Sequence, residues 1–187
     1  MIQSMKELKS ILSYEYDLYN KDYEFGSFVN RFKLKLIKDR RYRIWQFQKY
    51  SRCADYYRHT NEGFRFFNAL LFLYYSRRKN LIGERLGFDF SSYNISKGLQ
   101  LYHSNVVINS RSKIGLNLHL HGENVIGNNG KESACPVIGD NVMMGAGSKV
   151  FGNVIIANNI KIGAGAIVVS SFIEEGITLV GVPAHKK

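Results

Sequence analysis

The second half of the chain carries an aliphatic residue at every sixth position. The repeat runs through two stretches that share one phase, with members Ile108, Ile114, Leu120, Ile126, then Ile138, Met144, Val150, Ile156, Ile162 and Val168. Position 132 falls in phase but holds Glu132, within NNGKESACP. We therefore expect an extended loop near residues 128–136 that leaves the array and rejoins it in register.

A period of six suits neither an α-helix nor an ordinary strand. It suits a triangular coil, in which each flat side takes about six residues and an aliphatic side chain fills the interior. The residue four positions after each aliphatic one is mostly small or apolar, which helps at a corner, and glycine often follows the aliphatic residue. The pattern predicts a parallel β-helix of hexapeptide repeats over residues 89–187.

The first half of the chain has a helical period instead. Apolar residues recur at helical spacing in three groups, namely Leu8, Ile11, Leu12, Tyr16 and Tyr19; Phe28, Phe32, Leu36, Ile44 and Phe47; and the run from Phe64 to Tyr75. The third group is rich enough in apolar residues to predict a mostly buried helix. We therefore expect a helical N-terminal region over residues 1–88 and an α+β protein overall.

Composition supports a change of architecture near residue 90. Of the 25 aromatic residues 21 precede residue 91, whereas 13 of the 17 glycines follow it. Residues 1–90 hold 18 Lys and Arg against 10 Asp and Glu, and the remainder holds 8 against 5. A positive surface favours anionic partners. The basic helices could contact a membrane surface, or they could simply be solvated. Because no nucleic-acid motif accompanies the charge, we expect no nucleic-acid partner.

Cysteine usage and hydropathy point to the cytoplasm. Cys53 and Cys135 form neither a disulfide framework nor a C-x-x-C pair. The stretch FRFFNALLFLYYSRRK has an apolar core about half the roughly 20 residues that span a bilayer. We expect a cytoplasmic protein, with the inner face of the membrane as a location that the basic helices would allow.

Two stretches resemble a known family. The stretch from KIGLNLHLHGENVIG to GITLVGVPA resembles the C-terminal portion of serine acetyltransferases and, more closely, their shorter homologues of capsular and exopolysaccharide synthesis. LGFDFSSYNISKGLQLYH resembles the start of the β-helix in the same enzymes. The resemblance covers residues 80–187. It implies a left-handed β-helix, acetyl-CoA as co-substrate, and a homotrimer whose active site lies between subunits.

The resemblance assigns the catalytic pair. Acetyl transfer to a hydroxyl needs a base that works near neutral pH, and imidazole suits this task. His103 matches the family's catalytic histidine, and Asp89 in LGFDF matches the aspartate that orients the histidine. The other reading of Asp89, a turn or cap, stays open, as does a solvent-facing corner for His103.

The resemblance also assigns contacts to the co-substrate and acceptor. Gly145 and Ala146 in MGAGS, and Gly163 and Ala164 in IGAGA, match turns whose backbone binds the pantetheine arm, although tight corners need the same residues. Lys186 and Lys187 could pair with the phosphates of CoA, or form a frayed tail.

For the acceptor pocket we expect Tyr102, His121 and Asn124. The histidines of the H-x-H motif, His119 and His121, face outward by the repeat phase, because Leu118 and Leu120 face inward. They could instead be plain surface residues.

Three histidines raise the alternative of a zinc-dependent lyase of the gamma-class carbonic anhydrase type. The H-x-H spacing differs from the histidine spacing of that class, so we expect no metal. A non-catalytic basic scaffold is a third reading.

The acceptor is where the sequence departs from serine acetyltransferases. Tyr102 stands where those enzymes carry an aspartate that helps to hold the amino acid, and Cys135 replaces a histidine before Pro136. We therefore expect an acetyl-CoA-dependent O-acetyltransferase that acts on a sugar or polysaccharide precursor. Serine O-acetylation in cysteine biosynthesis is the alternative.

Overall fold

The structure is a computed structural model that describes residues 2–23, 26–131 and 133–187. The chain divides into two compact units, Met1–Leu86 and Gly87–Lys187. Each unit is considered by itself below.

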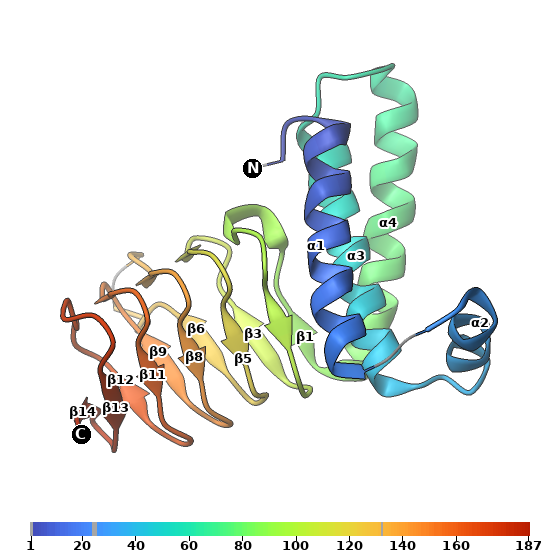
Figure 1. Ribbon diagram of the computed structural model, residues 1–187. Helices are drawn as coiled ribbons and strands as arrows, with labels where there is room; N and C mark the ends of the chain where they lie inside the picture. The colour runs from blue at the N-terminus through green and yellow to red at the C-terminus, as the bar shows by residue number, and fades with distance from the viewer. Residues whose placement is uncertain (1, 24–25, 132) are drawn as a thin grey trace. The chain divides into compact units, whose positions relative to one another are not determined.

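The first unit is helical. Over the described residues its elements are α1 (Met5–Tyr23), α2 (Phe28–Leu36), α3 (Arg40–His59) and α4 (Arg65–Leu86) (Figure 1). Polar residues begin two of these helices. The Ser27 side chain accepts a hydrogen bond from the Asn30 N–H, and Asp39 accepts one from the Tyr42 N–H at 2.9 Å. Such N-caps satisfy backbone donors that a helix leaves without partners in its first turn.

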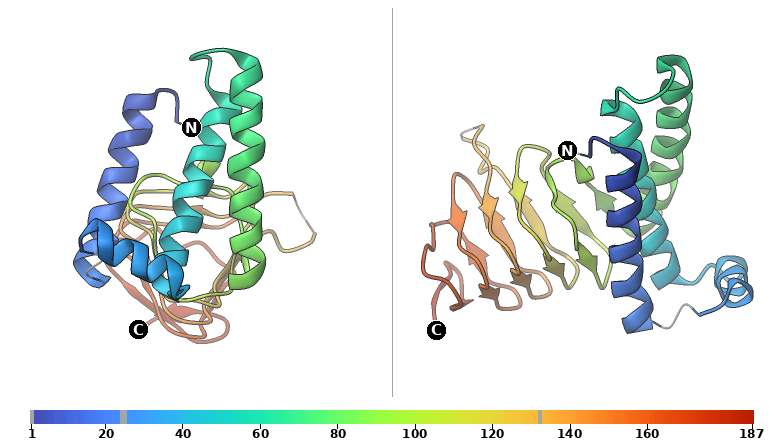
Figure 2. Two further views of the ribbon diagram at one scale, coloured as in Figure 1. Left: turned by 90° about the vertical axis from the view of Figure 1, so that its right-hand side faces the viewer. Right: turned by 45° about the horizontal axis from the view of Figure 1, so that its top comes forward.

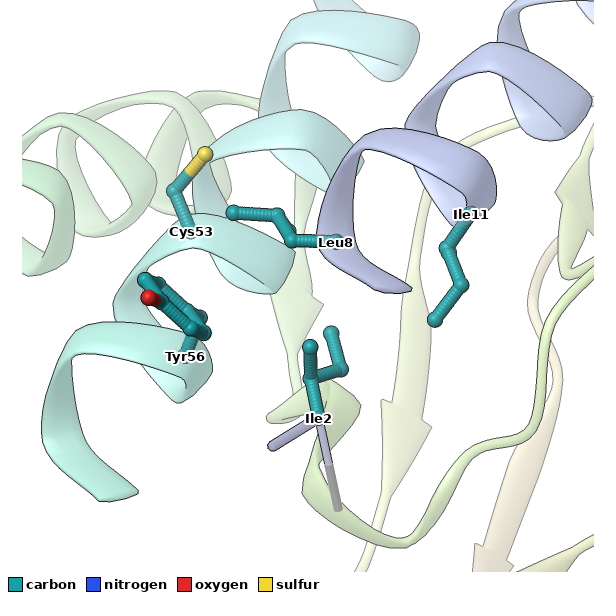
Figure 3. Packing of buried hydrophobic residues seen from close by; sticks show 5 residues of the cluster. All are labelled: Ile2, Leu8, Ile11, Cys53 and Tyr56. Carbon is teal, nitrogen blue, oxygen red and sulfur yellow. The ribbon is translucent and has the colours of Figure 1, made fainter. Parts of the chain in front are cut away.

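An apolar cluster joins α1 to α3. Leu8 and Ile11 of α1 pack with Cys53 and Tyr56 of α3, and Ile2 completes the cluster (Figure 3). Burial raises the pKa of the Cys53 thiol to about 11, so the group stays protonated at neutral pH. Both cysteines are free.

A buried ion pair links the same two helices. Arg52 on α3 donates to Glu15 on α1, with 2.6 Å between Nη2 and Oε1, and both side chains are almost wholly inaccessible. Nearby, the Tyr19 hydroxyl donates to the Gln48 side chain at 2.9 Å. Polar groups buried in this way cost free energy unless they are hydrogen-bonded, so these pairs fix how α1 and α3 align.

The expectation of a mostly buried helix over Phe64–Tyr75 is wrong for this chain. The exposed fractions of Phe66 and Leu73 on α4 are 70% and 61%, and Phe64, just before α4, is 78% exposed. The segment is apolar on all sides, but within this unit α4 packs mainly against α3, so much of its apolar surface stays uncovered. The apolar residues of α2 are exposed as well.

The second unit is a parallel β-helix of three sheets over the described residues. The first sheet contains β1 (Phe88–Asp89), β3 (Val106–Ile108), β6 (Val125–Gly127), β9 (Lys149–Phe151) and β12 (Ile167–Val168). The second contains β4 (Lys113–Ile114), β7 (Val137–Ile138) and β10 (Ile155–Ile156). The third contains β2 (Gln100–Leu101), β5 (His119–Leu120), β8 (Met143–Met144), β11 (Lys161–Ile162), β13 (Thr178–Val180) and β14 (His185–Lys186). A short 3₁₀ helix, Ser92–Asn94, lies between β1 and β2. Figure 2 shows the coils stacked along one axis.

The six-residue pattern is confirmed as the packing pattern of this unit. All ten repeat aliphatics are buried, and outside the loop so are the residues four positions later, namely Ser112, Leu118, Asn124, Val142, Ser148, Val154, Ile160 and Ala166. Each six-residue side therefore directs two side chains inward. Coils pair at a spacing of 18 residues, as at Val137 and Ile155. Lys113 and Val137 pair at 24, because a loop of six extra residues intervenes. The array thus resumes in register after that loop; Glu132, at its centre, lies outside the described residues.

Asparagines form a ladder at one corner. Asn117, Asn141 and Asn159 have φ angles of 54°, 55° and 60°. The Asn117 amide donates to Asn141 at 2.9 Å, and the Asn141 amide donates to Asn159 at 3.1 Å. Asparagine tolerates the left-handed region better than most residues, so the same side chain that permits the turn also links successive coils.

No helix among the described residues is long and apolar enough to cross a membrane.

Removing one partner of the buried ion pair should strongly destabilise the helical unit. We expect Glu15→Ala to lower its free energy of unfolding by about 3–5 kcal/mol, because the buried charge of Arg52 would lose the carboxylate that pairs with it. The matched control is Glu174→Ala, which breaks the exposed pair between Lys186 and Glu174 and should cost about 0–1 kcal/mol. Urea unfolding followed by far-UV circular dichroism measures both. Equal losses in the two variants would contradict a structural role for the buried pair.

Candidate functional site

His103 lies at a corner of the β-helix, between β2 and β3, and its side chain is exposed. The residue beneath it on the next coil is Gly122, whose φ is 102°. A Cβ atom at Gly122 would lie 2.6 Å from the Cβ of His103 and 3.1 Å from the Ser104 carbonyl oxygen. Only glycine fits there, so the backbone of one coil supports His103 of the coil before it.

The strand register continues this corner into a column. β2 pairs with β5, β5 with β8, and β8 with β11, which sets His103, Gly122, Ala146 and Ala164 at equivalent places on successive coils. Backbone bonds join these corners, since the Gly147 N–H donates to the Gly122 oxygen at 2.9 Å and the Gly165 N–H to the Ala146 oxygen at 2.8 Å. His103 is the only large side chain of this column.

A second column runs beside the first and contains Tyr102, His121, Gly145 and Gly163. The Tyr102 and His121 rings stack with centroids 4.6 Å apart, and the Tyr102 hydroxyl lies 3.2 Å from Nδ1 of His119. The next two coils carry Gly145 and Gly163 at this place, so only backbone atoms line the column after the two aromatic rings. A Cβ atom at Gly145 would lie only 2.6 Å from the Ala164 nitrogen.

The two histidines of the H-x-H motif face outward, as predicted. Leu118 and Leu120 are fully buried, whereas His119 and His121 are half-buried. Within the described part of the chain, Nε2 of His121 is buried and has no hydrogen-bond partner. An unpaired buried nitrogen is costly unless a ligand or water binds it, so this atom marks a place for a polar group.

The corner turns leave backbone donors free. Ala146 and Ala164 are exposed, and their N–H groups have no hydrogen-bond partner among the described residues. Glycine on either side of each alanine keeps these turns open to an incoming chain. The candidate CoA-binding residues therefore lie together, in the same two columns as His103 and Tyr102.

Asp89 is exposed on β1, where it pairs in register with Val107. The structure places no hydrogen bond between Asp89 and His103 among the residues that it describes. The role of Asp89 as the residue that orients His103 therefore stays a prediction.

Asn124 is fully buried, which differs from its expected place in the acceptor pocket. Its side-chain oxygen accepts from the Gly122 N–H at 2.8 Å, and its amide donates to the Gly145 oxygen at 2.8 Å and to Ser148. Asn124 thus braces the corner beneath His103 from inside, with no surface for an acceptor.

The C-terminal lysines belong to a sheet rather than to a frayed tail. Lys186 lies on β14, antiparallel to β13, and the Lys187 N–H donates to the Thr178 oxygen at 2.9 Å. The Lys186 ammonium lies 2.5 Å from the Glu174 carboxylate, and both groups are exposed.

No cluster of three His, Cys, Asp or Glu side chains among the described residues is placed to share a metal ion.

The sequence analysis did not identify Gly122 as a residue of the site. A signal for it was present, because glycine here stands two positions after the repeat aliphatic rather than one, directly after His121.

No family model matches the chain. Curated relatives do: a serine acetyltransferase of Staphylococcus epidermidis is 40% identical over 94 residues, which are 49% of this chain and 44% of the relative. One of Staphylococcus xylosus is 36% identical over 82 residues, 43% of this chain and 38% of the relative. The chain spans less than half the length of these relatives in the match.

Solved structures agree with the fold. Serine acetyltransferase of Brucella abortus in complex with coenzyme A has a TM-score of 0.69 at 20% identity, covering 97% of this chain and 68% of that one. The enzyme of Neisseria gonorrhoeae in complex with serine has a TM-score of 0.66 at 23% identity, covering 96% and 69%. These likenesses confirm the fold class, helices followed by a left-handed β-helix, and the resemblance to serine acetyltransferases.

Gly122→Ala should destabilise the protein by more than the cost of placing alanine at a positive φ angle. The new Cβ atom would meet His103, which adds an overpacking cost of about 1–3 kcal/mol to the cost of a positive φ. Gly176→Ala is the matched control, since its φ is 73° and nothing lies within 4 Å of the added atom. The measurements are the free energy of unfolding and the NMR chemical shifts of the His103 ring. Equal destabilisation with an unmoved His103 would contradict the contact.

Proposed function

We propose that the protein is an acetyl-CoA-dependent O-acetyltransferase with His103 as its general base. One observation carries the proposal: His103 heads a column whose next members are glycine and alanine, with free N–H groups at Ala146 and Ala164. An extended thioester could lie along this column with its reactive end at the imidazole. The curated relatives are serine acetyltransferases, and the Brucella enzyme was solved with coenzyme A.

The chemistry follows from the groups in the columns. His103 takes the proton of the acceptor hydroxyl while the oxygen attacks the thioester carbonyl. The carbon–sulfur bond then breaks, and the CoA sulfur leaves as a thiolate that takes the same proton back from His103. A backbone N–H can stabilise the charge that develops on the carbonyl oxygen. The N–H groups of Ala146 and Ala164 would hold the pantetheine arm, and Gly145 and Gly163 would let it lie close.

Asp89 and the terminal lysines would complete the site. Asp89 would serve as a positioning residue, and would have to come within hydrogen-bond reach of His103 when substrates bind, since catalytic hydrogen bonds are often long in free enzymes. Lys187 would meet the phosphates of CoA. Lys186 would do so by leaving its exposed partner Glu174 for a phosphate group. This exchange costs little free energy, because the Lys186–Glu174 pair is exposed to solvent.

We propose L-serine as the first acceptor to test, because the relatives and solved neighbours support it better than the sugar acceptor that sequence reasoning put first. A sugar hydroxyl is the second candidate. It is favoured by the Tyr102–His121 stack and the free Nε2 of His121, which offer an aromatic face and a polar atom but no carboxylate for an amino group.

We further propose a homotrimer and a peripheral membrane contact. Outward-facing aliphatic residues of the β-helix, among them Val107, Val137 and Ile155, are 39–52% exposed in the single chain, and other copies would cover them. In the helical unit, Phe28 and Phe32 of α2 are exposed and Lys33 and Lys35 flank them, an arrangement that suits an anionic membrane surface.

His103→Ala should reduce acetyl transfer by about 10²–10⁴-fold, because the acceptor hydroxyl would lose its base. Thiol release from acetyl-CoA in the presence of acceptor measures the rate. The control is His59→Ala, at the end of α3 in the helical unit, where Nδ1 of the ring lies 2.8 Å from the Asp55 carbonyl oxygen. Full activity in His103→Ala would contradict the mechanism and favour a scaffold; zinc-dependent activity without acetyl transfer would favour a lyase.

The same assay decides the acceptor. With L-serine and a panel of sugars at equal concentration, we expect the largest kcat/KM for serine. Tyr102→Phe separates the candidates further, because it removes the hydroxyl beside His119 but keeps the ring that stacks on His121. Transfer to sugars alone would overturn serine as the acceptor while leaving the chemistry in place.

A further inference from the structure

A pocket of about 340 Å³ lies within the helical unit, between the end of α2, the start of α3 and the end of α4. Five cations line it, namely Lys35, Lys38, Arg43, Arg78 and Arg85. Among the residues that the structure describes, no aspartate or glutamate lines it. Nothing in the proposed acetyl transfer uses this pocket.

The nearest acidic residues in sequence do not line the pocket. Asp39 caps α3, since its carboxylate accepts the Tyr42 N–H at 2.9 Å. Glu84 on α4 is exposed and does not line the pocket. Five like charges, four on α2, α3 and α4 and one in the turn between α2 and α3, repel one another across a concave surface, and such a surface concentrates the field that attracts an anion.

The other lining residues suit an organic group attached to that anion. Tyr42, Tyr50, Leu81 and Ile82 provide aromatic and aliphatic walls, and the Arg78 guanidinium carbon lies 5.9 Å from the Tyr50 ring centre. Burial raises the pKa of the Tyr42 hydroxyl, so this group stays neutral and leaves the positive charge intact. The volume is within the usual range for small-molecule sites.

We propose that this pocket binds the phosphate groups of a phosphorylated organic molecule, with Arg43 and Arg78 as its principal contacts. Guanidinium groups bind phosphate oxygens through paired, charge-assisted hydrogen bonds, and the lysines add charge. The phosphate could belong to a free metabolite or to a lipid headgroup. The proposal is independent of acetyl transfer, so either can fail without the other.

The test measures pyrophosphate binding to the full-length protein by isothermal titration calorimetry. We expect the double variant Arg43→Gln with Arg78→Gln to raise the Kd about tenfold or more, because it removes two charge-assisted contacts. The matched control is Lys9→Gln with Arg77→Gln, which removes the same charge from exposed residues of the helical unit outside the pocket. The control should change the Kd by less than about twofold. Circular dichroism verifies that both variants stay helical.

A second arm distinguishes the two sources of phosphate. Vesicles of phosphatidylcholine with or without phosphatidic acid are floated with the protein, and pyrophosphate is added as a competitor. Flotation that needs phosphatidic acid, and that both pyrophosphate and the pocket variant abolish, supports a lipid headgroup. Pyrophosphate binding without flotation supports a free metabolite. No pyrophosphate binding, or equal weakening in both double variants, would overturn the proposal.

Discussion

The structure of the second unit depends on a single constraint: side chains at two positions of every six must fill a narrow interior. The aliphatic position is buried from Ile108 to Val168, and the position four residues later is buried from Ser112 to Ala166 outside the loop. Because each coil stacks on the next with parallel pairing, a one-residue error would turn the interior side chains of a strand to the surface. The constraint therefore also sets which outward residues share a column. His103 lies above Gly122, and Tyr102 beside His121, as consequences of interior packing.

Local and periodic features were predictable from the sequence. The six-residue phase predicts the coils, the return at Ile138 after the loop, and the outward direction of His119 and His121. Features that depend on the path of the backbone around a corner were not. The register of Asp89 opposite Val107 is one example. Asn124 is another, since a polar residue at an inward position was taken to face a ligand but is satisfied inside the corner.

Helical periodicity also has a limit that α4 illustrates. An apolar run predicts that other parts of the protein cover a helix, but it does not identify those parts. In this unit α4 keeps an exposed apolar surface.

The basic pocket was not predicted from the sequence for a related reason. Its cations come from three helices and the turn between two of them, at positions 35 to 85, and no spacing in the sequence marks them as neighbours.

The columns have a consequence for how such a site can change. Neighbouring strands lie about 4.8 Å apart, so a ligand stretched along a column meets a new coil at each such step. Each coil contributes its outward corner residue separately, while the interior residues that hold the coil are different ones. Replacing Tyr102 or His121 changes the column at one level and leaves Gly145 and Gly163 at the next levels as they were. On the proposed function, a change of acceptor would therefore need substitutions in the first coils alone, while the coils proposed to bind the donor stay the same.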